Sequence, residues 1–91
     1  MMQKAFQAII SGRVQMVTYR DFAERSARGL EIVGMVRNLP NGAVEVIAQG
    51  REEALKLYLE KLKEGPLFAR VDDIRIEWLK SPIQFSEFTI L

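Results

Sequence analysis

Apolar and polar side chains alternate along several stretches of the chain, a pattern typical of strands with one buried face. In Lys4–Ser11 the side chains of Phe6, Ala8 and Ile10 share one side, and Gly12 is expected to end this strand. Similar patterns predict strands at Ile32–Asn38, Ala43–Gln49, Val71–Leu79 and Phe85–Ile90, with Ser81-Pro82 between the last two. In these later strands the residues predicted to face the core are Val44, Val46, Ala48, Ile74, Ile76, Trp78, Phe88 and Ile90.

Apolar positions three and four residues apart predict two helices. The first begins at Thr18, which has the capping-box spacing with Asp21, and Gly29 is expected to end it. The second is predicted at Glu52–Lys63, and Gly65-Pro66 stops it. The apolar stripes of the two helices consist of Phe22, Ala23, Ala27 and Leu30, and of Ala54, Leu55, Tyr58, Leu59 and Leu62.

The predicted elements follow one another as β-α-β-β-α-β, with a short strand at the end. Pro40, Asn41 and Gly42 favour a hairpin turn between the two middle strands. This order predicts an α+β protein with the ferredoxin-like split β-α-β sandwich, in which an antiparallel sheet carries both helices on one face. A chain of 91 residues is expected to form a single domain, residues 1–91.

The chain contains neither cysteine nor histidine. Thiolate and imidazole chemistry is therefore excluded, both for nucleophiles and general bases and for metal ligands. The formal net charge of +1 provides no broad attraction to nucleic acid or to a membrane surface, and no apolar run approaches ~20 residues. We expect a cytoplasmic protein that binds neither nucleic acid nor membrane.

The stretch Ser11–Asp21 leads from a strand through a loop into a helix, which is a favourable place for an anion. The first N–H groups of a helix lack partners within the helix, and the helix dipole adds partial positive charge. Arg20 falls in the first turn, where its guanidinium could close over an oxyanion; the other interpretation is a solvated surface arginine. Asn38 ends a strand, where it either forms the following turn or holds a water molecule with its amide.

Two motifs in the chain resemble the signatures of the acylphosphatase family. Gly12–Arg20 reads G-R-V-Q-M-V-T-Y-R and is similar to the family pattern G-R-V-Q-G-V-x-F-R. Gly34–Asn38, followed by Pro40–Glu45, is similar to the second pattern, G-W-V-R-N-x-x-D-G-x-V-E. The resemblance covers nearly the whole chain. It departs at Met16, where the family has glycine, at Met35, where it has tryptophan, and at Thr18, where the residue is usually small.

The resemblance implies hydrolysis of the carboxyl-phosphate bond of an acyl phosphate, with no metal and no cofactor. Arg20 would bind the phosphoryl oxygens and Asn38 would hold the attacking water. A phosphate or sulfate ion is expected in the loop, and the protein is expected to be a monomer. The residues whose main-chain amides would line this phosphate-binding loop are Gln15, Met16, Val17, Thr18, Tyr19 and Arg20.

Met16 is the departure with the largest expected consequence. If this position requires a positive φ, a residue other than glycine costs about 1–2 kcal/mol, and a tilted amide would slow the reaction. We therefore expect either an acylphosphatase with reduced activity or a non-catalytic module that binds phosphate or an acyl phosphate with the same loop.

Overall fold

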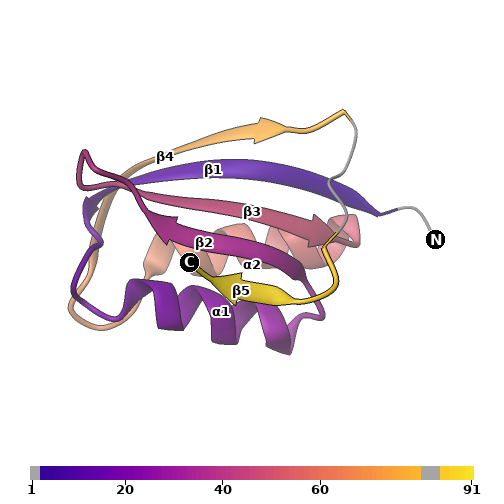
Figure 1. The fold of residues 1–91 in the computed structure, drawn as a ribbon, viewed down its shortest axis with the longest axis horizontal. Coiled ribbons are helices and arrows are strands. Elements are labelled where there is room, and N and C mark those ends of the chain that lie inside the picture. The colour runs from indigo at the N-terminus through magenta and orange to yellow at the C-terminus, as the bar shows by residue number, and fades with distance from the viewer. Residues whose placement is uncertain (1–2, 81–84) are drawn as a thin grey trace.

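The computed structural model describes residues 3–80 and 85–91, and it contains one sheet and two helices (Figure 1). The sheet has the strand order β4-β1-β3-β2-β5, antiparallel except where β5 runs parallel to β2. Both helices cover one face, and the predicted ferredoxin-like fold is confirmed. The elements are β1 (Lys4–Arg13), α1 (Tyr19–Gly29), β2 (Val33–Asn38), β3 (Val44–Gly50), α2 (Glu52–Glu64), β4 (Arg70–Trp78) and β5 (Phe88–Ile90).

The core lies between the helices and the central strands. Alternate residues of β1 and β3 point into it, as the sequence pattern predicts, and α2 contributes its apolar stripe. Two buried tyrosines join the helices to each other: the Tyr58 hydroxyl donates to the carbonyl of Ala23 at 2.9 Å, and the Tyr19 hydroxyl donates to that of Leu62 at 2.6 Å. The second of these bonds fixes the start of α1, where the candidate site begins.

Strand β1 is longer than predicted, because Gly12 lies inside it. The pairing with β4 shifts by one residue between Ser11 and Gly12, which makes a β-bulge. Gly12 has a φ of 129°, and a Cβ atom there would lie 2.2 Å from the carbonyl oxygen of Arg70. Glycine therefore allows the two strands to approach closely, and it does not end β1.

Helix α1 ends differently from the prediction. Gly29 is its last residue, and the left-handed position that usually takes glycine is occupied by Glu31, with a φ of 57°. The main-chain N–H of Ile32 donates to Ala27 at 2.9 Å and that of Glu31 donates to Arg28 at 3.1 Å. These two bonds satisfy carbonyls of the last turn without a glycine.

The last two strands are more exposed than the alternation predicts. Trp78 does turn toward the core, since its ring meets that of Phe6 at a centroid distance of 5.5 Å, but Trp78 is 45% exposed and Ile76 is 37% exposed. The helices therefore cover this edge strand only in part. Near the end, the strand begins only at Phe88, which is buried, whereas Ile90 is 38% exposed. The predicted break at Ser81-Pro82 lies outside the described residues.

Candidate active site

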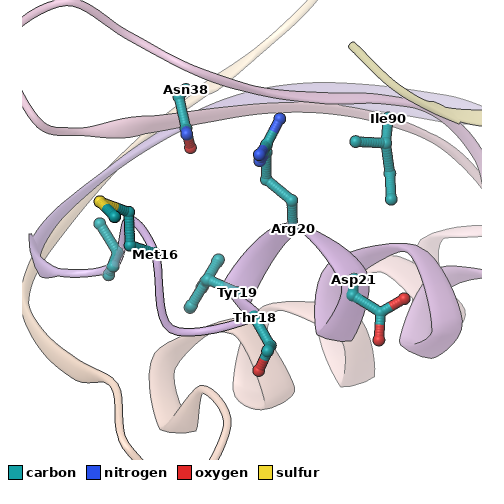
Figure 2. A pocket seen from close by; sticks show the side chains of 8 residues that line it. Met16, Thr18, Tyr19, Arg20, Asp21, Asn38 and Ile90 are labelled. Atoms are coloured by element: carbon teal, nitrogen blue, oxygen red, sulfur yellow. The ribbon is translucent and has the colours of Figure 1, made fainter.

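A cavity of about 180 Å³ lies where the loop before α1 faces the end of β2. Figure 2 shows the side chains of Arg20 and Asn38 pointing into the same space, one from α1 and the other from β2. The structure therefore brings together the two residues for which the sequence predicts chemistry, although 17 positions separate them in the chain. The residues that line the cavity are Val14, Met16, Thr18, Tyr19, Arg20, Asp21, Asn38 and Ile90.

Gln15 ties the loop to the hairpin that carries Asn38. Its side-chain amide donates to the main-chain carbonyl of Leu39 at 2.8 Å and to that of Ala43 at 2.9 Å. Val14, only 1% exposed, anchors the loop on the core side. These contacts hold the loop and the end of β2 at a fixed separation. Only the main-chain amide of Gln15 was predicted to belong to the site, and nothing in the composition of the loop indicates the role of its side chain.

The loop backbone has the curvature of an anion-binding nest. Met16 and Thr18 adopt left-handed conformations, with φ of 61° and 62°, on either side of Val17. Alternating handedness of this kind turns successive N–H groups toward one concave side. Within residues 3–80 and 85–91, the main-chain N–H groups of residues 15–20 make no hydrogen bond. The loop therefore presents a set of free donors next to the start of α1, where the helix dipole adds partial positive charge.

The predicted capping box at Thr18 is wrong. The Thr18 hydroxyl donates to the carbonyl of Val17 at 2.5 Å, and this N-cap side chain makes no capping bond to the start of α1. The left-handed conformation of Thr18 turns its side chain away from the first-turn amides. Asp21 instead pairs with Arg25 at 3.0 Å along the helix surface. The helix start thus lacks the oxygen ligand that a capping residue would supply, and its amides remain open.

A contact with Leu91 fixes the position of the Arg20 side chain. One guanidinium nitrogen donates to the main-chain oxygen of Leu91 at 3.0 Å, and the N–H of Leu91 donates to Val36 at 2.9 Å. This contact directs Arg20 toward the sheet and the cavity, whereas a solvated surface arginine would extend into water. The neighbouring Arg37 does not contribute, because it pairs with the nearly buried Glu45 at 2.5 Å.

Asn38 has a buried side-chain oxygen, Oδ1, without a hydrogen-bond partner among the described residues. An unsatisfied buried acceptor costs about 1–3 kcal/mol, so such an atom commonly has a ligand or a water molecule as its partner. The alternative role, turn formation, belongs to Asn41, whose side-chain oxygen accepts from the N–H of Ala43 at 3.0 Å. The amide of Asn38 therefore remains available to the cavity.

The side chain of Met16 lies at the rim of the cavity and is 98% exposed. Its backbone has a positive φ, the conformation in which a residue other than glycine is expected to be strained. Met35, the other large departure from the family pattern, is 7% exposed, so methionine fills a buried place there.

The acylphosphatase family model matches residues 6–90. The chain belongs to this family. It is 49% identical over 71 residues to an acylphosphatase from Thermus thermophilus, an alignment that covers 78% of this chain and 81% of the relative. An acylphosphatase from Salinibacter ruber is 39% identical over 88 residues, which cover 97% and 93% of the two chains. The crystal structure of acylphosphatase from Bacillus subtilis superimposes with a TM-score of 0.94 at 34% identity, over 99% of both chains.

Residues 3–80 and 85–91 contain no cluster of three or more acidic, histidine or cysteine side chains that could hold a metal ion. In the same residues no helix is both long and apolar enough to cross a membrane.

Proposed function

We propose that this member of the acylphosphatase family hydrolyses acyl phosphates to a carboxylate and phosphate, using the cavity between Arg20 and Asn38. The observation that carries the proposal is the convergence of three features on a single cavity: the guanidinium of Arg20, the side-chain oxygen of Asn38 and the curved loop backbone. Within residues 3–80 and 85–91, the Asn38 oxygen and the loop N–H groups have no hydrogen-bond partner. The matching family supports the general activity, and the residue roles below are our own assignment.

The loop would bind the phosphoryl group. The N–H groups of residues 15–20 would donate to its oxygens, and the guanidinium of Arg20 would exchange the carbonyl of Leu91 for a phosphoryl oxygen or bridge the two. A charged donor and several preorganised amides stabilise the negative charge of a phosphoryl group most strongly when they are excluded from bulk water. The same donors lead us to expect a phosphate or sulfate ion in the loop.

Asn38 would orient the attacking water. Its buried Oδ1 accepts a hydrogen bond from the water, which aims a lone pair of the water oxygen at phosphorus. As the new P–O bond forms, the bond from phosphorus to the acyl oxygen breaks and the carboxylate leaves with the electron pair. One water proton stays on the attacking oxygen, which becomes part of the phosphate, and the other passes to a phosphoryl oxygen. Because a carboxylate is a stable leaving group, positioning and charge stabilisation suffice, and neither a histidine nor a cysteine is required.

Met16 would lower the activity only modestly. Its backbone already has the left-handed conformation that glycine would adopt, so the neighbouring N–H groups keep their direction. Its side chain extends into solvent at the rim. Losing one donor costs about 10²–10³ in rate, and we expect a smaller loss here, less than about tenfold.

The test is hydrolysis of acetyl phosphate by the purified protein in buffer containing a chelator, measured as inorganic phosphate released. We expect kcat/KM to fall by about 10²-fold or more in Arg20→Ala and clearly in Asn38→Ala. Arg37→Ala and Asn41→Ala are the matched controls, because each removes the same side-chain type close to the site without emptying the cavity. Both controls are expected to retain activity within about threefold.

The same experiment distinguishes the enzyme from the alternative, a non-catalytic module that binds phosphate. A wild-type protein that binds inorganic phosphate by calorimetry, loses this binding in Arg20→Ala and hydrolyses no acyl phosphate would be the non-catalytic binding module. Activity that survives in Arg20→Ala would refute the proposed mechanism. All the residues of the site come from one chain, so a monomer is sufficient for the reaction, and we expect a monomer at the low concentrations of the assay. The cytoplasmic location remains a prediction from the composition.

A further inference from the structure

We propose that at high concentration two copies of this chain pair along β4, antiparallel and centred on Ile76, so that their sheets join into one. This inference is independent of the proposed function. It rests on the edge of the sheet opposite β5, far along the strand order from the strand that carries Asn38.

At this edge strand β4 presents main-chain groups with which no other strand of residues 3–80 and 85–91 pairs. The N–H of Leu79 donates to Ala5 of β1 at 2.9 Å. Because main-chain groups of successive residues point to opposite sides of a strand, those of Glu77 and Arg75 also face β1, and those of Ile74, Ile76 and Trp78 face outward. No strand of the described residues lies on that side (Figure 1). A long open edge of this kind is a template for another strand.

The side chains along this edge are also exposed. Ile76 and Trp78, at 37% and 45% exposure, form an apolar row on the helix side of the strand. On the other side, the Arg75 side chain is 86% exposed and forms a solvent-exposed ion pair with Asp73 at 3.6 Å. Such an exposed ion pair contributes little, so its partners are available to another chain.

In one antiparallel register the side chains of β4 are complementary to those of β4 in a second copy. With Ile76 opposite Ile76 of the second copy, Ile74 lies opposite Trp78, and Arg75 lies opposite Glu77. Over Ile74–Trp78 each apolar residue meets an apolar residue, and each charge meets its opposite. The outward main-chain groups also fall opposite one another, so that each such pair can exchange two hydrogen bonds. Since the pairing is symmetric, each contact between two different residues, such as Arg75 and Glu77, occurs twice.

The β-bulge disfavours the nearest alternative. A register centred on Ile74 would place Arg75 opposite Asp73, but it would extend the pairing to Asp72 and Arg70. The bulge against Ser11 and Gly12 displaces the strand there, and Arg70 is engaged by Asp72 at 2.9 Å. The register centred on Ile76 uses only the regular part of β4. Because the contact is one strand wide, we expect a weak dimer, with a dissociation constant above about 10 µM.

Charge-swap variants test both the dimer and its register. The association of the full chain is measured by sedimentation equilibrium from about 10 µM to 1 mM, a range chosen to span weak association. Arg75→Glu would place two glutamates opposite each other, and Glu77→Arg would place two arginines opposite each other. We expect each single variant to weaken the dimer at least tenfold. The double variant Arg75→Glu/Glu77→Arg restores opposite charges and is expected to return the dissociation constant to within threefold of wild type.

Lys63→Glu on α2 is the control for net charge, since it makes the same change as Arg75→Glu at a distant exposed position. It is expected to dimerise as wild type does. Circular dichroism melting of each variant verifies that the fold is intact. A wild-type chain that stays monomeric throughout the range would overturn the proposal. A double variant as weak as Arg75→Glu, with Glu77→Arg unaffected, would replace the register by the one centred on Ile74.

Discussion

Replacing Met16 by glycine is expected to stabilise the protein. The φ of 61° at this position is strained for methionine, and the strain is worth about 1–2 kcal/mol. No packing is lost, because the side chain is 98% exposed. Glycine has more freedom in the unfolded chain, which costs about 0.4–1 kcal/mol. The difference is a net gain of about 0.5–1 kcal/mol, which corresponds to a rise in Tm of roughly 2–8 °C for a domain of this size.

Glu31 and Thr18 provide matched controls for this prediction. Both have the same backbone conformation as Met16, with φ of 57° and 62°, and both side chains are exposed. Glu31 lies beyond the end of α1, away from the cavity lined by Arg20 and Asn38. Glu31→Gly should therefore give a similar gain in stability with unchanged kcat/KM. Thr18→Gly should behave as Met16→Gly does.

The assay combines urea unfolding with acetyl phosphate hydrolysis on the same preparations. A Met16→Gly variant that is less stable than wild type, while Glu31→Gly is more stable, would refute the strain argument and show that the methionine side chain makes a stabilising contact. A gain in kcat/KM of about 10²-fold or more would mean that Met16 removes a complete phosphate donor in solution. That result would contradict the donor geometry of the loop.

Two further predictions concern the sheet and the helix pair. Gly34→Ala should destabilise the protein by at least about 3 kcal/mol more than Gly42→Ala in urea unfolding. A Cβ atom at Gly34 would lie 1.9 Å from the carbonyl oxygen of Ile47, whereas Gly42, also with positive φ, has open space around it. Equal losses of stability in the two variants would contradict this steric explanation. Burial raises the pKa of Tyr58, so its contribution to stability is present below the ordinary value of 10.0 and is lost as the pH rises above it. Tyr58→Phe should cost about 0.5–1.5 kcal/mol at pH 7 through the lost bond to Ala23. Between about pH 10 and 12 the stability of this variant should fall less steeply than that of wild type. Parallel pH profiles of stability would show that the ionisation of Tyr58 does not cause the loss.

The fold could be predicted from the sequence because periodicity records which face of each element is buried. Phe6, Ala8 and Ile10 are fully buried, and the predicted stripe of α2 is buried except for Ala54, which is partly buried. The exposure of Ile76 and Trp78 could not be predicted in this way. Alternation shows which side of a strand is apolar, but the depth of burial depends on how far a helix extends across the sheet, and this distance has no local signal.

In the candidate site, the functional side chains could be predicted from the sequence, but the backbone conformation could not. Arg20 and Asn38 were predicted because their residue types and their places beside a helix start and a strand end are visible in the sequence. The conformation of the loop before α1 was not predicted, since methionine and threonine at positions 16 and 18 are poor indicators of a left-handed backbone. In this loop the donors are main-chain N–H groups, which every sequence carries. Whether they converge depends on the anchoring of the loop by Gln15, Val14 and Tyr19. Substituting Gln15 should therefore disturb the site more than substituting the exposed Met16, although neither side chain would itself touch the phosphoryl group.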